Sequence, residues 1–201
     1  MDEYGFADVS YNFPEPEITW VKKDINALVL ESQKKERVNV VISTGTKMLA
    51  EIMPEVAEDK AYTFISVKGG FSSINFIDYI AKKSEIDELT VATLAVGKKH
   101  MRYLDKLPIK KAKFICSGIF EKRGLAKEYD YYDTFKTICE NHGWEYSNVN
   151  NHSKVILIRS GGKKYVLETS SNLNENPKIE QFCFQIDEKL YDFYYEFFKR
   201  L

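Results

Sequence analysis

The chain has 201 residues, of which 44% are hydrophobic and 29% are charged, and its formal net charge is −1. This length and composition are typical of a globular protein that buries a substantial core. No apolar run approaches the ~20 residues that cross a bilayer, and the acidic start Met1–Phe6 lacks the pattern of a secretory signal, so we expect a cytoplasmic protein with no membrane partner.

The first part of the chain shows little regular pattern until residue 18. Residues 1–16 contain two prolines without clear periodicity and predict an arm. Apolar residues recur at helical spacing over 18–35, and the run 38–42 predicts a strand. A short helix that ends near Pro54 should follow.

Strands and helices alternate along the rest of the chain. Because alternation of this kind is typical of βαβ units, the sequence predicts an α/β fold with a mixed, mainly parallel sheet and helices on both faces. The predicted strands are 62–67, 89–94, 112–116, 144–149, 155–158 and 163–168, and the predicted helices are 73–83, 98–107 and 128–141.

Three cysteines, Cys116, Cys139 and Cys183, are odd in number and widely spaced in apolar or helical surroundings. Disulfide frameworks and zinc sites need paired or clustered cysteines at short spacings. We therefore expect small core residues in a reducing compartment, with no metal and no disulfide.

Positive charge gathers in one stretch although the whole chain is nearly neutral. Between Lys98 and Arg123 there are nine basic residues and two acidic ones. Such a stripe fits a phosphate backbone, with Lys98, Lys99 and Arg102 as candidate nucleic-acid contacts. A solvated helix face is an equally good interpretation at this point.

Polar side chains bracket a predicted hairpin in the last third of the chain. His152 and Lys154 are two residues apart, so on a strand they point to the same face. After the turn chemistry of 159–162, the returning strand brings Ser170 and Asn172 back toward His152. An imidazole, an ammonium, a hydroxyl and a carboxamide around one point suit a phosphodiester. Ser170 and Asn172 could also simply cap the loop.

This arrangement resembles the phospholipase D superfamily, whose signature is His-x-Lys-x4-Asp followed by Gly-Ser-x-Asn. His152 and Lys154 match the first part, and 169–172 (Thr-Ser-Ser-Asn) match the second. The segment 179–186 looks like the last strand of the family, in which Glu180 takes the place of the glutamate that supports the histidine. The segment 187–201 looks like the closing helix of the family. The amino-acid sequence of 171–181 is similar to that of family members from phages and mobile elements.

The resemblance implies a division of the chain, and the chain departs from the family pattern in two respects. It covers 56–201, which leaves 1–55 as an extension suited to contact a partner protein. Arg159 stands where the signature has Asp, and the hairpin is longer than in the family pattern. The motif is therefore compatible with an active or a decayed site.

The family's chemistry implies roles for these residues. One histidine attacks phosphorus and a second protonates the leaving oxygen, while lysines, asparagines and serines neutralise charge on the phosphate, and no metal or cofactor takes part. Because this chain has a single His-x-Lys, the resemblance implies a homodimeric nuclease with catalytic His152, Lys154, Asn172, Glu180 and Ser170. The alternative is an inactive nucleic-acid-binding or structural protein of a phage or mobile element, with virion association as one location.

Three other residues compete for roles. Glu168 ends a predicted strand before the serine-rich loop and could replace Glu180 beside the imidazole. His142 precedes Gly143 in a pattern typical of a helix C-terminus, which indicates a structural role. His100 lies in the basic stretch, where it is either structural or in contact with a phosphate.

Overall fold

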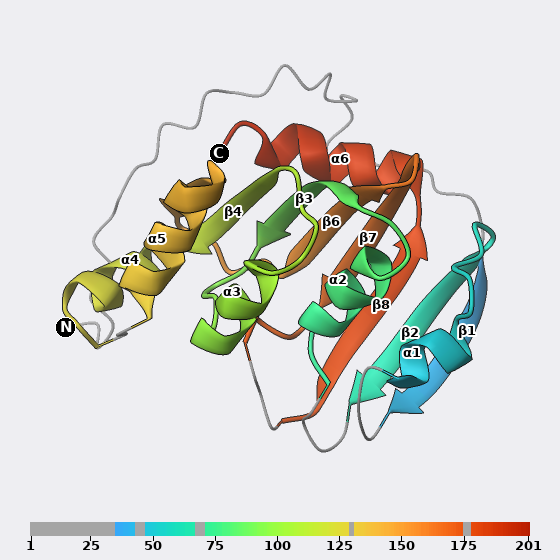
Figure 1. Cartoon of the computed structure of the whole chain (residues 1–201). Coiled ribbons are helices and arrows are strands. Elements are labelled where there is room, and N and C mark those ends of the chain that lie inside the picture. The colour runs from blue at the N-terminus through green and yellow to red at the C-terminus, as the bar shows by residue number, and fades with distance from the viewer. Residues whose placement is uncertain (1–34, 43–46, 67–70, 129–130, 175–177) are drawn as a thin grey trace, which may run out of the picture. The chain divides into compact units, whose positions relative to one another are not determined.

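The computed structural model describes residues 35–42, 47–66, 71–128, 131–174 and 178–201 (Figure 1). The chain divides into two compact units, Met1–Glu31 and Ser32–Leu201, and every described residue belongs to the second. The predicted arm and nearly all of the predicted helix at 18–35 lie outside the described residues. No helix in the described ranges is long and apolar enough to cross a membrane.

The described residues form one eight-stranded sheet with the order β1-β2-β8-β7-β6-β3-β4-β5. Neighbours β1/β2, β3/β4 and β4/β5 are parallel, and the other four pairings are antiparallel. Thus β6 and β8 run against the other six strands, and the predicted mixed α/β fold is confirmed. The strands are β1 Glu36–Ile42, β2 Lys60–Ser66, β3 Ile86–Ala92, β4 Ala112–Ser117, β5 Glu145–Val149, β6 Val155–Ser160, β7 Lys163–Thr169 and β8 Glu180–Ile186.

Helices cover both faces of the sheet, as predicted (Figure 1). One face packs against α6, where Tyr191 and Phe198 join a cluster with Leu157. The opposite face carries the larger core, to which the other five helices contribute. The helices are α1 Lys47–Ile52, α2 Ile74–Ala81, α3 Lys98–Leu104, α4 Gly118–Leu125, α5 Tyr132–His142 and α6 Glu188–Phe198.

The predicted hairpin is present as β6 and β7. Gly161 and Gly162 take φ values of 57° and 75°, which glycine adopts without the steric cost of a Cβ. The tight turn sets the register, which pairs Val155 with Glu168. Because of this register, the residue before β6 lies beside the end of β7: the Thr169 amide donates to the Lys154 carbonyl at 3.1 Å.

Helix α4 is the element that the sequence did not predict. It is eight residues long, contains Gly118 and Gly124, and leaves Ile119 and Leu125 exposed, so its sequence lacks a continuous apolar stripe. Its place depends on contact with α5, which no local pattern reveals.

We expect Gly124→Ala to destabilise the protein by about 1–3 kcal/mol. A Cβ on Gly124 would lie 2.4 Å from Cβ and Cγ of Tyr132, whose ring is buried and unable to retreat. Urea unfolding measures the change. Gly118→Ala is the matched control in the same helix, since its Cβ would come no closer than 3.9 Å to the Val149 carbonyl oxygen. Equal stability of the two variants would contradict the packing argument.

Candidate functional site

Strand direction brings the predicted site residues to one edge of the sheet. The carboxyl ends of β3, β4 and β7 meet there with the starts of β6 and β8, because β6 and β8 run in the opposite direction. His152 and Lys154 precede β6, Ser170 and Asn172 follow β7, and Glu180 begins β8. All five therefore lie at this edge, which we call the site edge.

His152 and Lys154 lie side by side. Lys154 Nζ is 3.2 Å from His152 Nδ1 and donates to the His152 carbonyl at 2.7 Å. The histidine is exposed, and Nδ1 accepts from the ammonium when the neutral ring carries its proton on Nε2. Partial desolvation lowers the pKa of Lys154, while the negative charge of Glu180 acts in the opposite direction. Glu180 thus favours the charged ammonium.

Glu180 binds Ser170 in this structure. The carboxylate is 6% exposed, and the Ser170 hydroxyl donates to its Oε2 atom. The same hydroxyl oxygen accepts from the Gln181 amide at 2.9 Å, so Ser170 links the loop after β7 to the start of β8. The family role had placed Glu180 against the imidazole, where the structure instead has Lys154.

Glu168 lies on the other face of the sheet. Tyr194 of α6 donates its hydroxyl to Glu168 Oε1, and this phenol accordingly has a raised pKa, for which burial is the first cause and the bond to Glu168 the second. Successive residues of a strand point to opposite faces of the sheet. The side chain of Glu168 therefore lies on the α6 face, whereas Lys154 and Glu180 lie on the opposite face. Its carboxylate serves the contact with α6.

Asn172 joins two loops at the site edge. Its Oδ1 atom accepts from the Leu94 amide at 3.3 Å, which connects the loop after β7 with the loop after β3. The next residue, Leu173, donates its amide to Thr93 Oγ1 at 3.1 Å. The amide nitrogen of the Asn172 side chain makes no hydrogen bond within the described ranges, so it remains a donor for a ligand.

Sequence reasoning missed Asn151 and Thr93. Asn151 Nδ2 donates to the carbonyls of Thr93 and Ile115 at 3.1 and 2.8 Å, at the ends of β3 and β4. Its Oδ1 atom accepts from the amide and hydroxyl of Ser153 at 2.9 and 2.6 Å. An asparagine followed two residues later by serine is the signal for such a turn. The bonds to β3 and β4 have no local signal.

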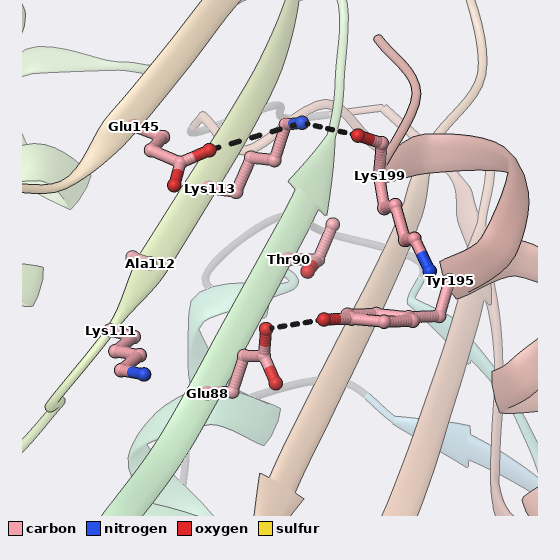
Figure 2. A pocket seen from close by; sticks show the side chains of 8 residues that line it. All are labelled: Glu88, Thr90, Lys111, Ala112, Lys113, Glu145, Tyr195 and Lys199. Atoms are coloured by element: carbon pink, nitrogen blue, oxygen red, sulfur yellow. Dashed lines mark hydrogen bonds and ion pairs between the residues drawn. The ribbon is translucent and has the colours of Figure 1, made fainter.

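Arg159 lies at the end of β6 away from the site edge. Its Nη2 atom is 2.8 Å from Glu88 Oε2, and Tyr195 of α6 donates to Glu88 Oε1 at 3.1 Å. Figure 2 shows the Glu88–Tyr195 bond in a cavity of about 260 Å³, which also holds Lys113 at 3.9 Å from Glu145. Arg159, at the position where the resemblance led us to look for Asp, therefore joins an ion pair on the α6 face, away from His152.

The basic stretch divides between several parts of the fold. Lys98 and Lys99 occupy the first turn of α3, and the Gly97 amide before them donates to the Leu173 carbonyl at 2.8 Å. This turn therefore begins beside the loop that carries Asn172. Arg102 is exposed one turn further along α3.

Other basic residues of the stretch lie at the start of β4, at the far edge of the sheet. There Lys110 pairs with Glu85 and Asp87 at 2.8 and 2.9 Å. Of these two groups, the geometry favours the α3 residues as an extension of the site edge.

The two other histidines have structural contacts. His100 is 4% exposed, and its Nε2 atom is 3.0 Å from Ser72 Oγ. His142 is 2.8 Å from Asp105 Oδ1 and stacks on Trp144 just before Gly143, which ends the helix in the left-handed conformation. These contacts agree with the structural interpretation of both.

In the part of the chain that the structure describes, no three His, Cys, Asp or Glu side chains lie close enough together to hold a metal ion. The cysteines Cys116 and Cys139 are buried and free, and burial raises the pKa of Cys139 to about 12. Thiol groups so protonated are poor ligands and nucleophiles.

Comparison with known proteins found no matching protein-family model and no matching curated protein. Yeast tyrosyl-DNA phosphodiesterase matches with a TM-score of 0.37 and 11% identity, over 60% of this chain and 31% of that one. TrmBL2, an archaeal chromatin protein, matches with a TM-score of 0.42 and 12% identity, over 76% of this chain and 55% of that one. This chain thus spans less than a third of the first protein and about half of the second. Likenesses at this level assign neither a family nor an activity.

Proposed function

We propose that this protein is a metal-independent phosphodiesterase of phospholipase D type that acts on nucleic acid. The observation that carries the proposal is the contact between His152 and Lys154 at the site edge, which also carries Ser170, Glu180 and Asn172. A nucleophile, a cation and neutral donors are the groups that phosphoryl transfer needs.

The reaction would take two steps. In the first, the Lys154 ammonium turns from His152 Nδ1 to the phosphate, so that the neutral imidazole carries its proton on Nδ1 and its Nε2 lone pair forms a bond to phosphorus. The bond from phosphorus to the leaving oxygen breaks, and that oxygen takes a proton from a second imidazole, which begins the step protonated. In the second, water attacks the phosphohistidine, gives its proton to the second imidazole and releases His152. Lys154 and Asn172 would neutralise the non-bridging oxygens. The chain has one His-x-Lys, so the second imidazole would be His152 of the partner subunit in a two-fold dimer.

Nucleic acid is the proposed substrate because Lys98 and Lys99 begin α3 beside the loop of Asn172. A polymer of phosphates running over the site edge would meet these side chains as well as Lys154. A small soluble phosphodiester would not need them.

The test is cleavage by wild-type protein of single- and double-stranded DNA and RNA, each with excess chelator. The proposal expects chelator-resistant cleavage of at least one substrate and a phosphohistidine trapped on His152 by a short oligonucleotide. Sedimentation at micromolar concentration should show a dimer. A fully active monomer would overturn the shared site, and no cleavage of any substrate would overturn the enzyme.

A second function is favoured by a specific observation. Arg159 replaces the signature Asp and is bound to Glu88, and His152 has Lys154 at Nδ1 where the family's supporting carboxylate would be. We propose as the alternative an inactive nucleic-acid-binding or structural protein of a phage or mobile element, with 1–55 contacting a partner protein. If the wild-type protein binds nucleic acid but does not cleave it, the inactive alternative is the correct one.

We expect neutralisation of the α3 cations to weaken nucleic-acid binding and flatten its salt dependence. In the triple variant Lys98→Gln, Lys99→Gln, Arg102→Gln, each lost phosphate contact should reduce the slope of log K against log salt by about 0.7–0.9. The triple Lys110→Gln, Lys111→Gln, Lys113→Gln removes the same charge near the start of β4 and is the control. Equal slopes of log K against log salt for both variants would indicate that the α3 cations form a solvated helix face and make no specific contact with phosphate.

We expect Glu180→Gln to move the alkaline limit of activity to lower pH. Lys154 must be charged to neutralise a phosphate, so activity falls as the pH rises through its pKa. Desolvation lowers that pKa and Glu180 raises it, so loss of the carboxylate should lower the pKa further. A pH–rate profile measures the shift. Glu168→Gln, on the α6 face, is the control and should keep the wild-type limit.

A further inference from the structure

Asn151 uses every hydrogen-bonding position of its carboxamide. The nitrogen donates twice, to the carbonyls of Thr93 and Ile115, and the oxygen accepts twice, from the amide and hydroxyl of Ser153, all within 3.1 Å. Thr93 follows β3 and Ile115 lies near the end of β4. One side chain thus ties two strands to the turn on which His152 lies.

Thr93 is hydrogen-bonded both to the turn that carries His152 and to the loop that carries Asn172. The residue is 2% exposed; its carbonyl holds Asn151, and its hydroxyl oxygen accepts from the amide of Leu173, which follows Asn172. The turn of His152 and the loop of Asn172 are therefore both bonded to the same buried point. Their separation is set by short, directional contacts.

His152 and Lys154 are held in different ways. The carbonyl of Lys154 accepts from the Thr169 amide at 3.1 Å, which continues the β6–β7 ladder and anchors the lysine to β7. His152 lies before β6, and within the described ranges its ring nitrogen and its carbonyl both bind the Lys154 ammonium. The backbone on either side of it is fixed through Asn151 and Ser153.

We infer that Asn151 is a positioning residue for His152, fixing the imidazole relative to Lys154 and Asn172. The inference rests on the proposed function. An attacking nitrogen must stay within a few tenths of an ångström of its productive place, and misplacement by about 1 Å costs on the order of 100-fold in rate. Loss of the clamp should therefore affect the chemical step, whereas substrate binding through the independently anchored Lys154 should persist.

The experiment compares Asn151→Ala and Asn151→Asp with Asn150→Ala. Asn150 is the adjacent asparagine, is exposed, and makes no side-chain hydrogen bond within the described part of the chain, so it is a matched control. Asn151→Ala should lower kcat by about 10- to 100-fold with less than a twofold change in KM. Asn151→Asp keeps the oxygens that bind Ser153 but loses the donors to Thr93 and Ile115, so it should be as slow as the alanine variant.

A second readout does not depend on cleavage. The ring resonances of His152 and the amide hydrogen exchange of Ser153, measured by NMR on folded protein, should change in both Asn151 variants and stay at wild-type values in Asn150→Ala. If wild type cleaves nothing and these signals still change, the proposed function fails while the positioning of the ring is supported. Wild-type signals together with wild-type kcat in Asn151→Ala would overturn the inference, as would a rise in KM that matches the fall in kcat.

Discussion

Replacing His152 by alanine should lower the rate of phosphodiester cleavage by about four orders of magnitude or more, because it removes the atom that bonds to phosphorus. The fold should survive, since the side chain is exposed and its one hydrogen-bond partner in the described part of the chain is Lys154. Single-turnover cleavage of the best substrate measures the rate, and circular dichroism checks the fold. In a shared dimer site both imidazoles would be lost at once.

His142→Ala is the control for this variant. It removes another imidazole that is bound to Asp105 and stacked on Trp144 away from the site edge, so its cleavage rate should stay near that of wild type. Cleavage by His152→Ala at the wild-type rate would remove His152 from the mechanism.

Lys154 should act in the same mechanism as His152 and not additively with it. Lys154→Ala should lose activity and weaken phosphate binding, since it removes the ammonium beside the imidazole. Groups that work as a unit do not add their effects, so the double variant should be no slower than His152→Ala alone. An additive loss would indicate two separate contributions.

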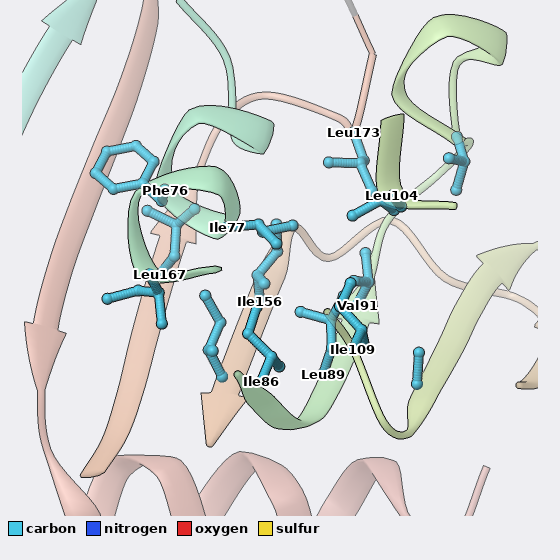
Figure 3. Close-up of a cluster of buried hydrophobic side chains, with 14 of the residues drawn as sticks. Phe76, Ile77, Ile86, Leu89, Val91, Leu104, Ile109, Ile156, Leu167 and Leu173 are labelled. Carbon is cyan, nitrogen blue, oxygen red and sulfur yellow. The ribbon is translucent and has the colours of Figure 1, made fainter. Parts of the chain in front are cut away.

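Phe76→Ala should destabilise the protein by about 3–5 kcal/mol, the largest stability effect that we expect from a single substitution. The ring has no exposed surface and lies with its centroid 5.0–5.6 Å from those of four other phenylalanines. Figure 3 shows it between α2 and the sheet, at one side of the buried residues that are drawn. Alanine would leave a cavity that these surrounding rings cannot fill. The four neighbours are Phe64, Phe71, Phe182 and Phe184.

Equilibrium unfolding in urea measures this loss, and Phe197→Ala is the matched control. Phe197 lies on α6 with 51% of its surface exposed, so its removal should change the free energy of unfolding by roughly 0.5 kcal/mol or less. If the two variants unfold at the same urea concentration, the phenylalanine cluster is not the stabilising centre of the fold.

Local patterns predicted most of the secondary structure. The hairpin of β6 and β7 was evident because two adjacent glycines between β-rich runs admit few other conformations. The end of α5 was evident from Gly143. The helix at 187–201 was expected from the resemblance, and in the structure Asp187 caps α6 by accepting from the Leu190 amide at 3.0 Å. Helix α4 lacked such signals, and its position comes from packing against α5.

The sequence by itself determined which polar residues lie at the same end of the hairpin, since the places of His152, Lys154, Ser170 and Asn172 follow from its register. Only the tertiary structure decided their partners. Glu180 accepts a hydrogen bond from Ser170 because β8 pairs with β7. Asn151 binds carbonyls at the ends of β3 and β4 because β6 pairs with β3. Spacing along one strand depends on short-range backbone geometry. The order of strands far apart in the chain depends on the burial of the whole core, which no local pattern contains.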